Sequence, residues 1–168
     1  MNSEILKKYN TLLTESRFIP NPNCEQFSPA GSSWQLSPEL GGGHYWLYAR
    51  KDLFDIKIHD FHFQNDFVLN FDIPEGISIT RYDSISGEEL NPYRRLSAGS
   101  IQTIVGGKQN YKAIIHKRIP IHSVGIEVFP AYYEDYLKKQ YPDAYFDLPT
   151  AFQCVDQAAE FPAMSKLL

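Results

Sequence analysis

Short runs of alternating apolar and polar side chains recur between residues 44 and 128, and they constrain the fold more than any other feature. In such a run, successive side chains point to opposite faces, which is typical of a half-buried β-strand. The pattern is clearest at residues 54–59, 67–73 and 77–82, with turn residues at 64–66, 74–76 and 86–87. Several short strands at about ten-residue spacing predict a sandwich or a barrel.

Further strand-like segments complete this β-rich region. They lie at residues 44–50, 101–105 and 111–118, and in two parts at 119–128. The tight turn at 106–110 predicts that 111–118 is the hairpin partner of 101–105. Pro120 divides the last segment into two short strands, because proline has no N–H to donate to a neighbouring strand. Residues 91–99 are interpreted as a connection between strands. About eight strands predict a small closed jelly roll with an interior wide enough for one ligand.

The first 43 residues follow a different pattern. Apolar side chains at helical spacing predict a helix at residues 3–14, with Ser3 as its N-cap. Residues 18–43 contain four prolines and three consecutive glycines, which predict an extended loop with one short strand at 34–36. The helix has two possible roles, which are packing against the barrel and moving when a ligand binds.

The last third of the chain is predicted to be helical. Pro130 can open a helix over 130–140, and Lys138 and Lys139 near its end complement the helix dipole. Two further helices are predicted at 149–157 and from Pro162. The apolar pattern continues to the last residue without a stop signal, so we expect the chain to be a fragment or an engineered domain. The expected divisions are residues 1–43 (helix and arm), 44–129 (barrel) and 130–168 (helical segment).

Two stretches near the end resemble a known family. The run IHSVGIEVFPAYYEDYLKKQYPDAY, residues 121–145, resembles the junction at which AraC-type transcriptional regulators pass from a cupin-like sensing barrel to C-terminal helices. The run FDLPTAFQCVDQAAEFPAMSKLL, residues 146–168, is similar to the continuation in many of them. The resemblance implies a mainly β, cupin-like jelly-roll barrel followed by two to three helices. It also implies a homodimer in the full-length protein, and a helix-turn-helix DNA-binding domain that this chain lacks.

Charge and cysteine content exclude some classes of protein. The formal net charge is −4, so this chain carries no basic footprint for nucleic acid, and DNA would be bound only through the missing domain. Cys24 and Cys154 form no CxxC pair, which favours reduced thiols. Neither a signal peptide nor a membrane-spanning run is visible. We therefore expect a cytoplasmic protein that does not associate with a membrane.

No motif predicts a metal or an active site. Metal-binding cupins place two histidines at H-x-H spacing, whereas His59 and His62 are three residues apart and would face opposite sides of a strand. His116 and His122 share parity, but Pro120 lies between them. Neither a nucleophile elbow nor a dinucleotide-binding fingerprint is present. The expectation is a barrel without metal, cofactor or catalytic residues, and so not an enzyme.

Five residues are candidates for ligand binding because inward-facing polar or amphipathic side chains determine what a pocket can hold. Arg81 shares parity with Ile77 and Ile79 and is predicted to point inward, although an exposed position at the strand end is the alternative. Trp46 and Tyr48 share a face and could stack on a ligand or simply pack in the core. His62 and His116 are weaker candidates for inward positions.

The function expected from the sequence is small-molecule sensing. An AraC-type sensing domain would bind its effector in the barrel and control the absent DNA-binding domain. The alternative is a cupin-class, metal-dependent enzyme, such as an isomerase or a dioxygenase, acting on a small metabolite. A third possibility is a stand-alone carbohydrate-binding module, favoured by the aromatic content. The sequence names neither the effector nor the direction of regulation.

Overall fold

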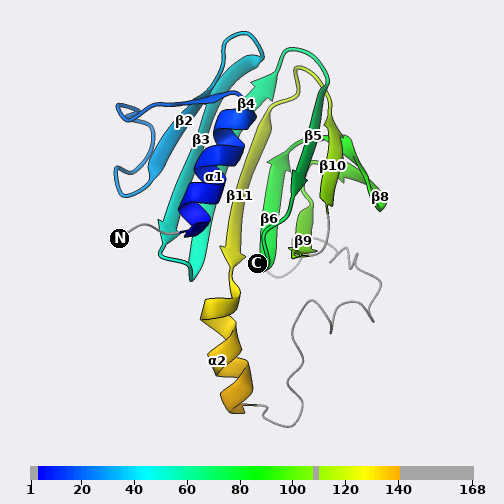
Figure 1. Ribbon diagram of the computed structural model, residues 1–168. Coiled ribbons are helices and arrows are strands. Elements are labelled where there is room, and N and C mark those ends of the chain that lie inside the picture. Colours follow the sequence, from blue (N-terminus) through cyan, green and yellow to red (C-terminus); the bar gives the residue numbers. More distant parts are fainter. Residues whose placement is uncertain (1–3, 108–109, 141–168) are drawn as a thin grey trace.

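The computed structural model describes residues 4–107 and 110–140, and these contain two helices and eleven strands (Figure 1). The elements, in chain order, are α1 (Glu4–Glu15), β1 (Phe18–Pro20), β2 (Ser32–Leu36), β3 (Gly41–Arg50), β4 (Phe54–Phe63), β5 (Phe67–Asp72), β6 (Ile77–Ser84), β7 (Ser86–Leu90), β8 (Tyr93–Ser97), β9 (Ile101–Val105), β10 (Asn110–Ile115), β11 (Ile121–Val128) and α2 (Pro130–Gln140).

The strands form two antiparallel sheets that face each other. The large sheet has the order β1-β2-β3-β4-β11-β6-β9, and the small sheet has the order β5-β10-β7-β8. Each sheet interleaves strands that are distant in sequence, so the chain crosses repeatedly from one sheet to the other (Figure 1). This arrangement confirms the predicted fold class, a mainly β, cupin-like jelly-roll barrel with helix after it; of the two to three helices predicted there, the described residues contain α2.

Three details of the predicted strand pattern are wrong. β9 pairs with β6 in the large sheet, whereas β10 pairs with β5 and β7 in the small sheet, so 101–105 and 111–118 are not hairpin partners. The connection predicted at 91–99 contains β8, which forms a hairpin with β7. β11 is one continuous strand because Pro120 lies just before its first residue and therefore interrupts no ladder.

The region predicted as an extended loop contributes two strands to the large sheet. The short strand predicted at 34–36 is confirmed as part of β2, which pairs with both β1 and β3. The loop between β1 and β2 folds over Trp46, whose indole Nε1 donates to the carbonyl oxygen of Ser28 at 2.9 Å. A Cβ atom at Gly31 would lie 2.5 Å from the Trp46 ring, so this close approach requires glycine.

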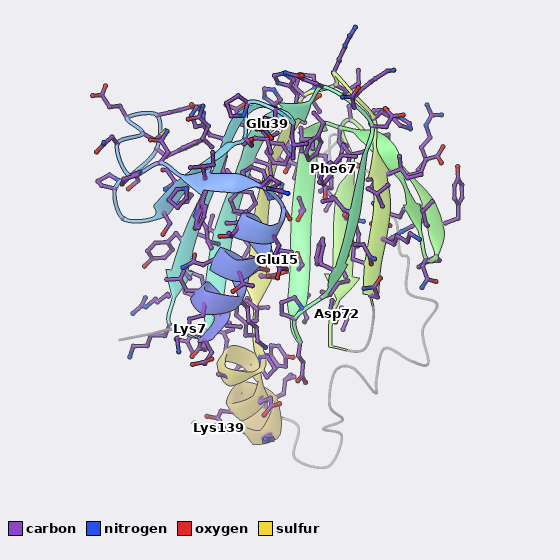
Figure 2. The ribbon with its side chains drawn as sticks, turned by 45° about the horizontal axis from the view of Figure 1, so that its top comes forward. Lys7, Glu15, Glu39, Phe67, Asp72 and Lys139 are labelled. Atoms are coloured by element: carbon purple, nitrogen blue, oxygen red, sulfur yellow. The ribbon has the colours of Figure 1, made fainter. Side chains whose placement is uncertain are left out.

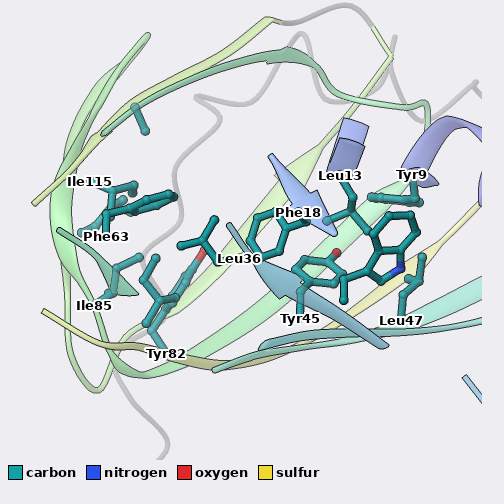
Figure 3. Close-up of a cluster of buried hydrophobic side chains, with 14 of the residues drawn as sticks. Tyr9, Leu13, Phe18, Leu36, Tyr45, Leu47, Phe63, Tyr82, Ile85 and Ile115 are labelled. Carbon is teal, nitrogen blue, oxygen red and sulfur yellow. The ribbon is translucent and has the colours of Figure 1, made fainter. Parts of the chain in front are cut away.

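The helix α1 lies alongside β3, β4 and β11 of the large sheet (Figure 1). It confirms the helix predicted at 3–14, although Ser3 lies outside the described residues. Its Tyr9 and Leu13 are buried. Figure 3 shows Tyr9 and Leu13 of α1 in the same buried cluster as Tyr45 and Leu47 of β3. At the start of the helix, Asp52 Oδ1 accepts a hydrogen bond from the backbone N–H of Ile5 at 3.1 Å, which satisfies a donor that the helix itself leaves free.

The helix α2 continues directly from β11 and extends away from the sheets, with Lys139 at its far end (Figures 1 and 2). It confirms the helix predicted at 130–140. Phe129, between β11 and α2, is buried, and its N–H donates to the carbonyl oxygen of Leu53. The helices predicted at 149–157 and from Pro162 lie outside the described residues. Neither α1 nor α2 has the length and apolar character needed to cross a membrane.

Candidate functional site: the cavity between the sheets

A cavity of about 170 Å³ lies inside the barrel, between the large and the small sheet. One wall is formed by apolar side chains of the small sheet, among them Leu69, Phe71 and Ile115. The opposite wall, formed by the large sheet, carries most of the polar lining. The helix α1 closes one side with Tyr9 and Leu13. The cavity is therefore amphipathic, with a different chemistry on each sheet.

The polar wall is built by strand register. Inward-facing residues of β4, β11 and β6 stand in three adjacent rows across the large sheet. From β4 to β6 these rows are Asp55–Glu127–Ser78, Lys57–Gly125–Thr80 and His59–Ser123–Tyr82. Because neighbours in a row have Cβ atoms about 5 Å apart, their side chains can interact directly.

Lys57 and Glu127 from these rows form a cluster with Tyr9 of α1. Lys57 Nζ lies 2.8 Å from Glu127 Oε2 and donates to the hydroxyl oxygen of Tyr9 at 2.6 Å. Tyr9 in turn donates to Glu127 Oε2. The Lys57 ammonium also lies over the Tyr9 ring, 4.5 Å from its centroid. This buried cluster joins α1, β4 and β11, and its opposite charges satisfy each other.

The electrostatics of the cluster distinguish its two acids. Burial alone would raise the pKa of Glu127, but the charge of Lys57 and the hydrogen bonds it receives hold that pKa below its ordinary value. Asp55 is fully buried, and its nearest cation, Lys57 Nζ, is 3.9 Å away. Burial, together with the neighbouring charge of Glu127, raises the pKa of Asp55 to about 8. At neutral pH the pair therefore carries one negative charge, located on Glu127.

His59 is neutral at physiological pH. Its ring faces the cavity, and Nδ1 is hydrogen-bonded to Ser123 Oγ at 2.8 Å. Enclosure in the barrel and, secondarily, the charge of Lys57 lower its pKa to about 3. Burial also raises the pKa of Tyr9 well above its ordinary value. Both groups can therefore form hydrogen bonds to a ligand without carrying charge.

A second polar network lies toward the other side of the cavity. The hydroxyl of Tyr82 donates to Gln102 Oε1 at 3.1 Å, and Gln102 Nε2 donates to Glu89. Arg94 Nε donates to Glu89 Oε2 at 2.6 Å, which neutralises this buried acid. Tyr82 and Gln102 line the cavity, whereas Glu89 and Arg94 support them from behind.

The cavity adjoins a groove of about 790 Å³ on the surface beside α1. The residues that line both spaces are Tyr9, Leu12, Phe71, Ile73 and Pro74. They come from α1 on one side and from β5 and the turn after it on the other. Access to the cavity from solvent is therefore between α1 and β5.

None of the five predicted ligand-binding residues lines the cavity. The inward orientation predicted for Arg81 is wrong, because its side chain is 72% exposed and pairs with the exposed Asp83. His62 is exposed on the outside of β4, opposite in direction to His59. In β6 the inward parity belongs to Ser78, Thr80 and Tyr82, while Ile79 is exposed.

The other three candidates make contacts within the protein. Trp46 is buried on the outer face of the large sheet beneath the loop between β1 and β2, and it stacks with Phe27 and Tyr48. Tyr48 is half-buried on that same face. His116 Nδ1 is hydrogen-bonded to Ser86 Oγ at 2.8 Å. These aromatic side chains therefore have packing roles outside the cavity.

The sequence pattern did contain a signal for the site. Lys57, Asp55 and Glu127 lie at strand positions that alternate with Ile56, Ile58 and Ile126. Alternation alone favours burial of the apolar set, whereas the structure buries the charged set and leaves Ile126 49% exposed. Tyr9 had no sequence signal beyond its place on the apolar face of a helix.

Within residues 4–107 and 110–140, no group of three His, Cys, Asp or Glu side chains is placed to hold a metal ion. His59 and His62 point to opposite sides of β4, as their spacing predicts. Cys24, the one cysteine in this part of the chain, is a free, half-buried thiol.

Comparisons with known proteins find resemblance only among solved structures. Neither a family model nor a curated protein matches the chain. KdgF from Halomonas sp. is 10% identical, with 60% of this chain and 80% of that chain covered and a TM-score of 0.36. The EutQ protein of Clostridium difficile is 10% identical, with 70% and 80% covered and a TM-score of 0.36. A cupin-superfamily sugar phosphate isomerase from Silicibacter pomeroyi is 8% identical, with 59% of each chain covered and a TM-score of 0.34.

Proposed function

We propose that this chain is the effector-sensing domain of an AraC-type transcriptional regulator. In this proposal a small molecule binds in the barrel and controls a DNA-binding domain that lies outside the chain. The protein acts in the cytoplasm, as a homodimer in its full-length form, and has no catalytic role. The resemblance, which covers roughly residues 40–168, suggests the family.

The observation that carries the proposal is the course of β11. Glu127 contributes to the buried cluster that lines the cavity, and α2 begins three residues later at Pro130. Phe129, between them, is held by burial and by its hydrogen bond to Leu53. A ligand that rearranges Glu127 would therefore act on the segment that leaves the barrel.

Tyr9, the member of the cluster that comes from α1, offers a way for the ligand to change the conformation of the domain. Tyr9 connects α1 to Lys57 and Glu127, and α1 forms one edge of the access route. A ligand changes a conformational equilibrium only if it binds two arrangements with different affinity. Competition between a ligand and Tyr9 for Lys57 or Glu127 would provide such a difference, because the competition exists only while α1 is docked.

A reporter fusion tests the proposal. The complete chain is joined to a DNA-binding domain that represses a reporter only in a defined relative arrangement of its two copies. A compound that raises the thermal unfolding temperature of the chain is expected to change reporter output. A ligand at one hundred times its dissociation constant adds about 2.7 kcal/mol of stability, which is readily detected.

The competing function, a metal-dependent cupin enzyme, predicts a different result. Stabilisation by iron, manganese or zinc salts alone, with turnover of a small metabolite and no change in reporter output, would contradict the sensor proposal. A second fusion, which carries Glu127→Gln, tests whether Glu127 transmits the effect of the ligand. This variant keeps the size of the side chain but removes the charge next to α2, so it should alter the reporter response to the compound.

A further inference from the structure

The two walls of the cavity make different demands on a ligand. The small sheet presents Leu69, Phe71 and Ile115, which offer no hydrogen bond. The large sheet presents the hydroxyls of Ser78 and Thr80 on β6. A polar ligand atom that faces the small sheet would lose its hydrogen bonds to water without replacement, which disfavours molecules that are polar all round.

Charge on the cavity wall is already neutralised. Lys57 and Glu127 are the charged side chains that line the cavity, and they pair at 2.8 Å. An anion could gain Lys57 only by displacing Glu127, which would leave a buried carboxylate unpaired. A cation would have the reverse effect on Lys57. The cavity therefore has no net charge for an ionic ligand to balance.

Two uncharged hydroxyl groups on the same wall remain available to a ligand. Within the described residues, the structure gives the hydroxyls of Ser78 and Thr80 no hydrogen bond, although both residues are buried. They lie two residues apart on the same face of β6, a separation of about 7 Å. Hydroxyl groups both donate and accept, so they suit the hydroxyl or carbonyl group of a neutral molecule.

Glycine in the neighbouring strand makes room for this arrangement. Gly125 faces inward between Lys57 and Thr80, and a Cβ atom there would lie 2.8 Å from Thr80 Oγ1. Since no side chain stands between them, Lys57 can reach diagonally to Glu127 while Thr80 keeps its hydroxyl at the cavity. A cavity of about 170 Å³ has room for one six-membered ring with a small substituent, because a cavity of about 150 Å³ holds benzene.

We propose that the cavity binds an uncharged organic molecule of one-ring size, with one or two hydroxyl or carbonyl groups on one side. These groups face Ser78 and Thr80, and the apolar side of the molecule packs against the small sheet. The inference rests on the proposed sensor function, since it names the ligand class of the same cavity. It separates neutral, half-apolar molecules from organic anions and from sugars.

Three probes of similar size test the ligand class. Isothermal titration calorimetry on the complete chain measures binding of benzyl alcohol, benzoate and glucose. Benzyl alcohol has one hydroxyl on an apolar ring, benzoate replaces it with a charge, and glucose is polar all round. We expect benzyl alcohol to bind at least tenfold more tightly than either of the others.

Variants locate the binding site. Thr80→Val removes one hydroxyl while keeping the shape of the side chain, and should weaken benzyl alcohol binding about fivefold, the effect of one neutral hydrogen bond. Thr103→Val makes the same change on β9, where the side chain does not line the cavity, and should leave binding unchanged. Ser78→Ala provides a second test of the wall if Thr80→Val fails to fold, as judged by circular dichroism.

The outcomes separate this inference from the proposed function. Tighter binding of benzoate or glucose, equal loss in Thr80→Val and Thr103→Val, or no binding by any probe would each overturn the ligand class. The sensor proposal would survive those results if another compound still changed the reporter output. It fails separately if compounds that stabilise the chain leave the reporter unchanged.

Discussion

At the scale of single residues, the barrel interior holds acids and a base where apolar side chains would normally pack. Asp55, Lys57 and Glu127 are nearly inaccessible to solvent, and one ion pair cannot neutralise two acids. The structure resolves this by keeping Asp55 protonated, at the cost of a pH-dependent stability.

Asp55 is predicted to destabilise the folded protein as the pH rises. Its pKa is about 8 in the fold against an ordinary 3.8, so between these values the folded chain retains a proton that the unfolded chain has released. The unfolding free energy contributed by this group therefore falls from about pH 4 to about pH 8 and is constant above. The unfolding free energy of Asp55→Asn should therefore exceed that of the parent by roughly 5 kcal/mol at pH 8 and match it near pH 4.

Urea denaturation at a series of pH values measures this difference. The matched control is Asp83→Asn, which makes the same change at an exposed strand position and should shift no part of the profile. A constant difference between Asp55→Asn and the parent from pH 4 to pH 8 would show that Asp55 is ionised in the fold.

His59 is predicted to destabilise the folded protein as the pH falls below 6.5. Its pKa is about 3 in the folded protein against an ordinary 6.5. Between these pH values the histidine is protonated in the unfolded chain and neutral in the folded chain. Stability is therefore lost progressively as the pH falls toward 3, by roughly 3 kcal/mol at pH 4. His59→Gln should remove that loss, whereas His62→Gln, on the exposed face of β4, should not. Denaturation midpoints at pH 7 and pH 4 test both variants.

At the scale of elements, α1 makes polar contacts with the barrel at its start and at its middle. Ile5 binds Asp52 at the start of the helix, and Tyr9 reaches Lys57 and Glu127 from its middle. The helix also forms one edge of the route into the cavity. A terminal helix beside a binding site can open locally without global unfolding.

Tyr9→Phe is predicted to loosen α1. The substitution keeps the ring over Lys57 but removes the hydroxyl that joins the two charges, which should lower stability by about 1–3 kcal/mol. Amide hydrogens of α1 should exchange faster, while those of β11 keep most of their protection. Tyr93→Phe, at an exposed position in β8, is the control and should change neither quantity. Equal exchange rates in Tyr9→Phe and the parent would show that the hydroxyl does not hold the helix.

At the scale of the whole molecule, the large sheet exposes an apolar outer face. Ile79, Val124 and Ile126 on β6 and β11 are each about half exposed. The polar side chains at its border pair within the chain, Arg81 with Asp83 at 3.1 Å and His122 with Asp60 at 3.7 Å. Two copies related by a twofold axis could therefore meet there without net repulsion, and this face suits the proposed homodimer.

Ile126→Lys is predicted to weaken self-association at least tenfold, because it places a charge within the apolar face. Val68→Lys is the matched control, since Val68 is equally exposed but lies on β5 of the small sheet. Sedimentation velocity over a concentration series measures both variants. If Val68→Lys dissociates the assembly and Ile126→Lys does not, the small sheet forms the interface.

Local patterns in the sequence predict the mainly β fold class and the helices α1 and α2, and they place His59 and His62 on opposite faces of β4. Periodicity reports these features because it depends on local geometry alone. Which face of each strand is buried depends on how the strands and α1 pack together. Alternation shows that Ile79 and Thr80 lie on opposite faces of the strand, but it does not show which face is inside. That depends on the partner strands and on α1. The buried cluster of Tyr9, Lys57 and Glu127 joins residues up to 118 positions apart, and no local pattern predicts such a meeting.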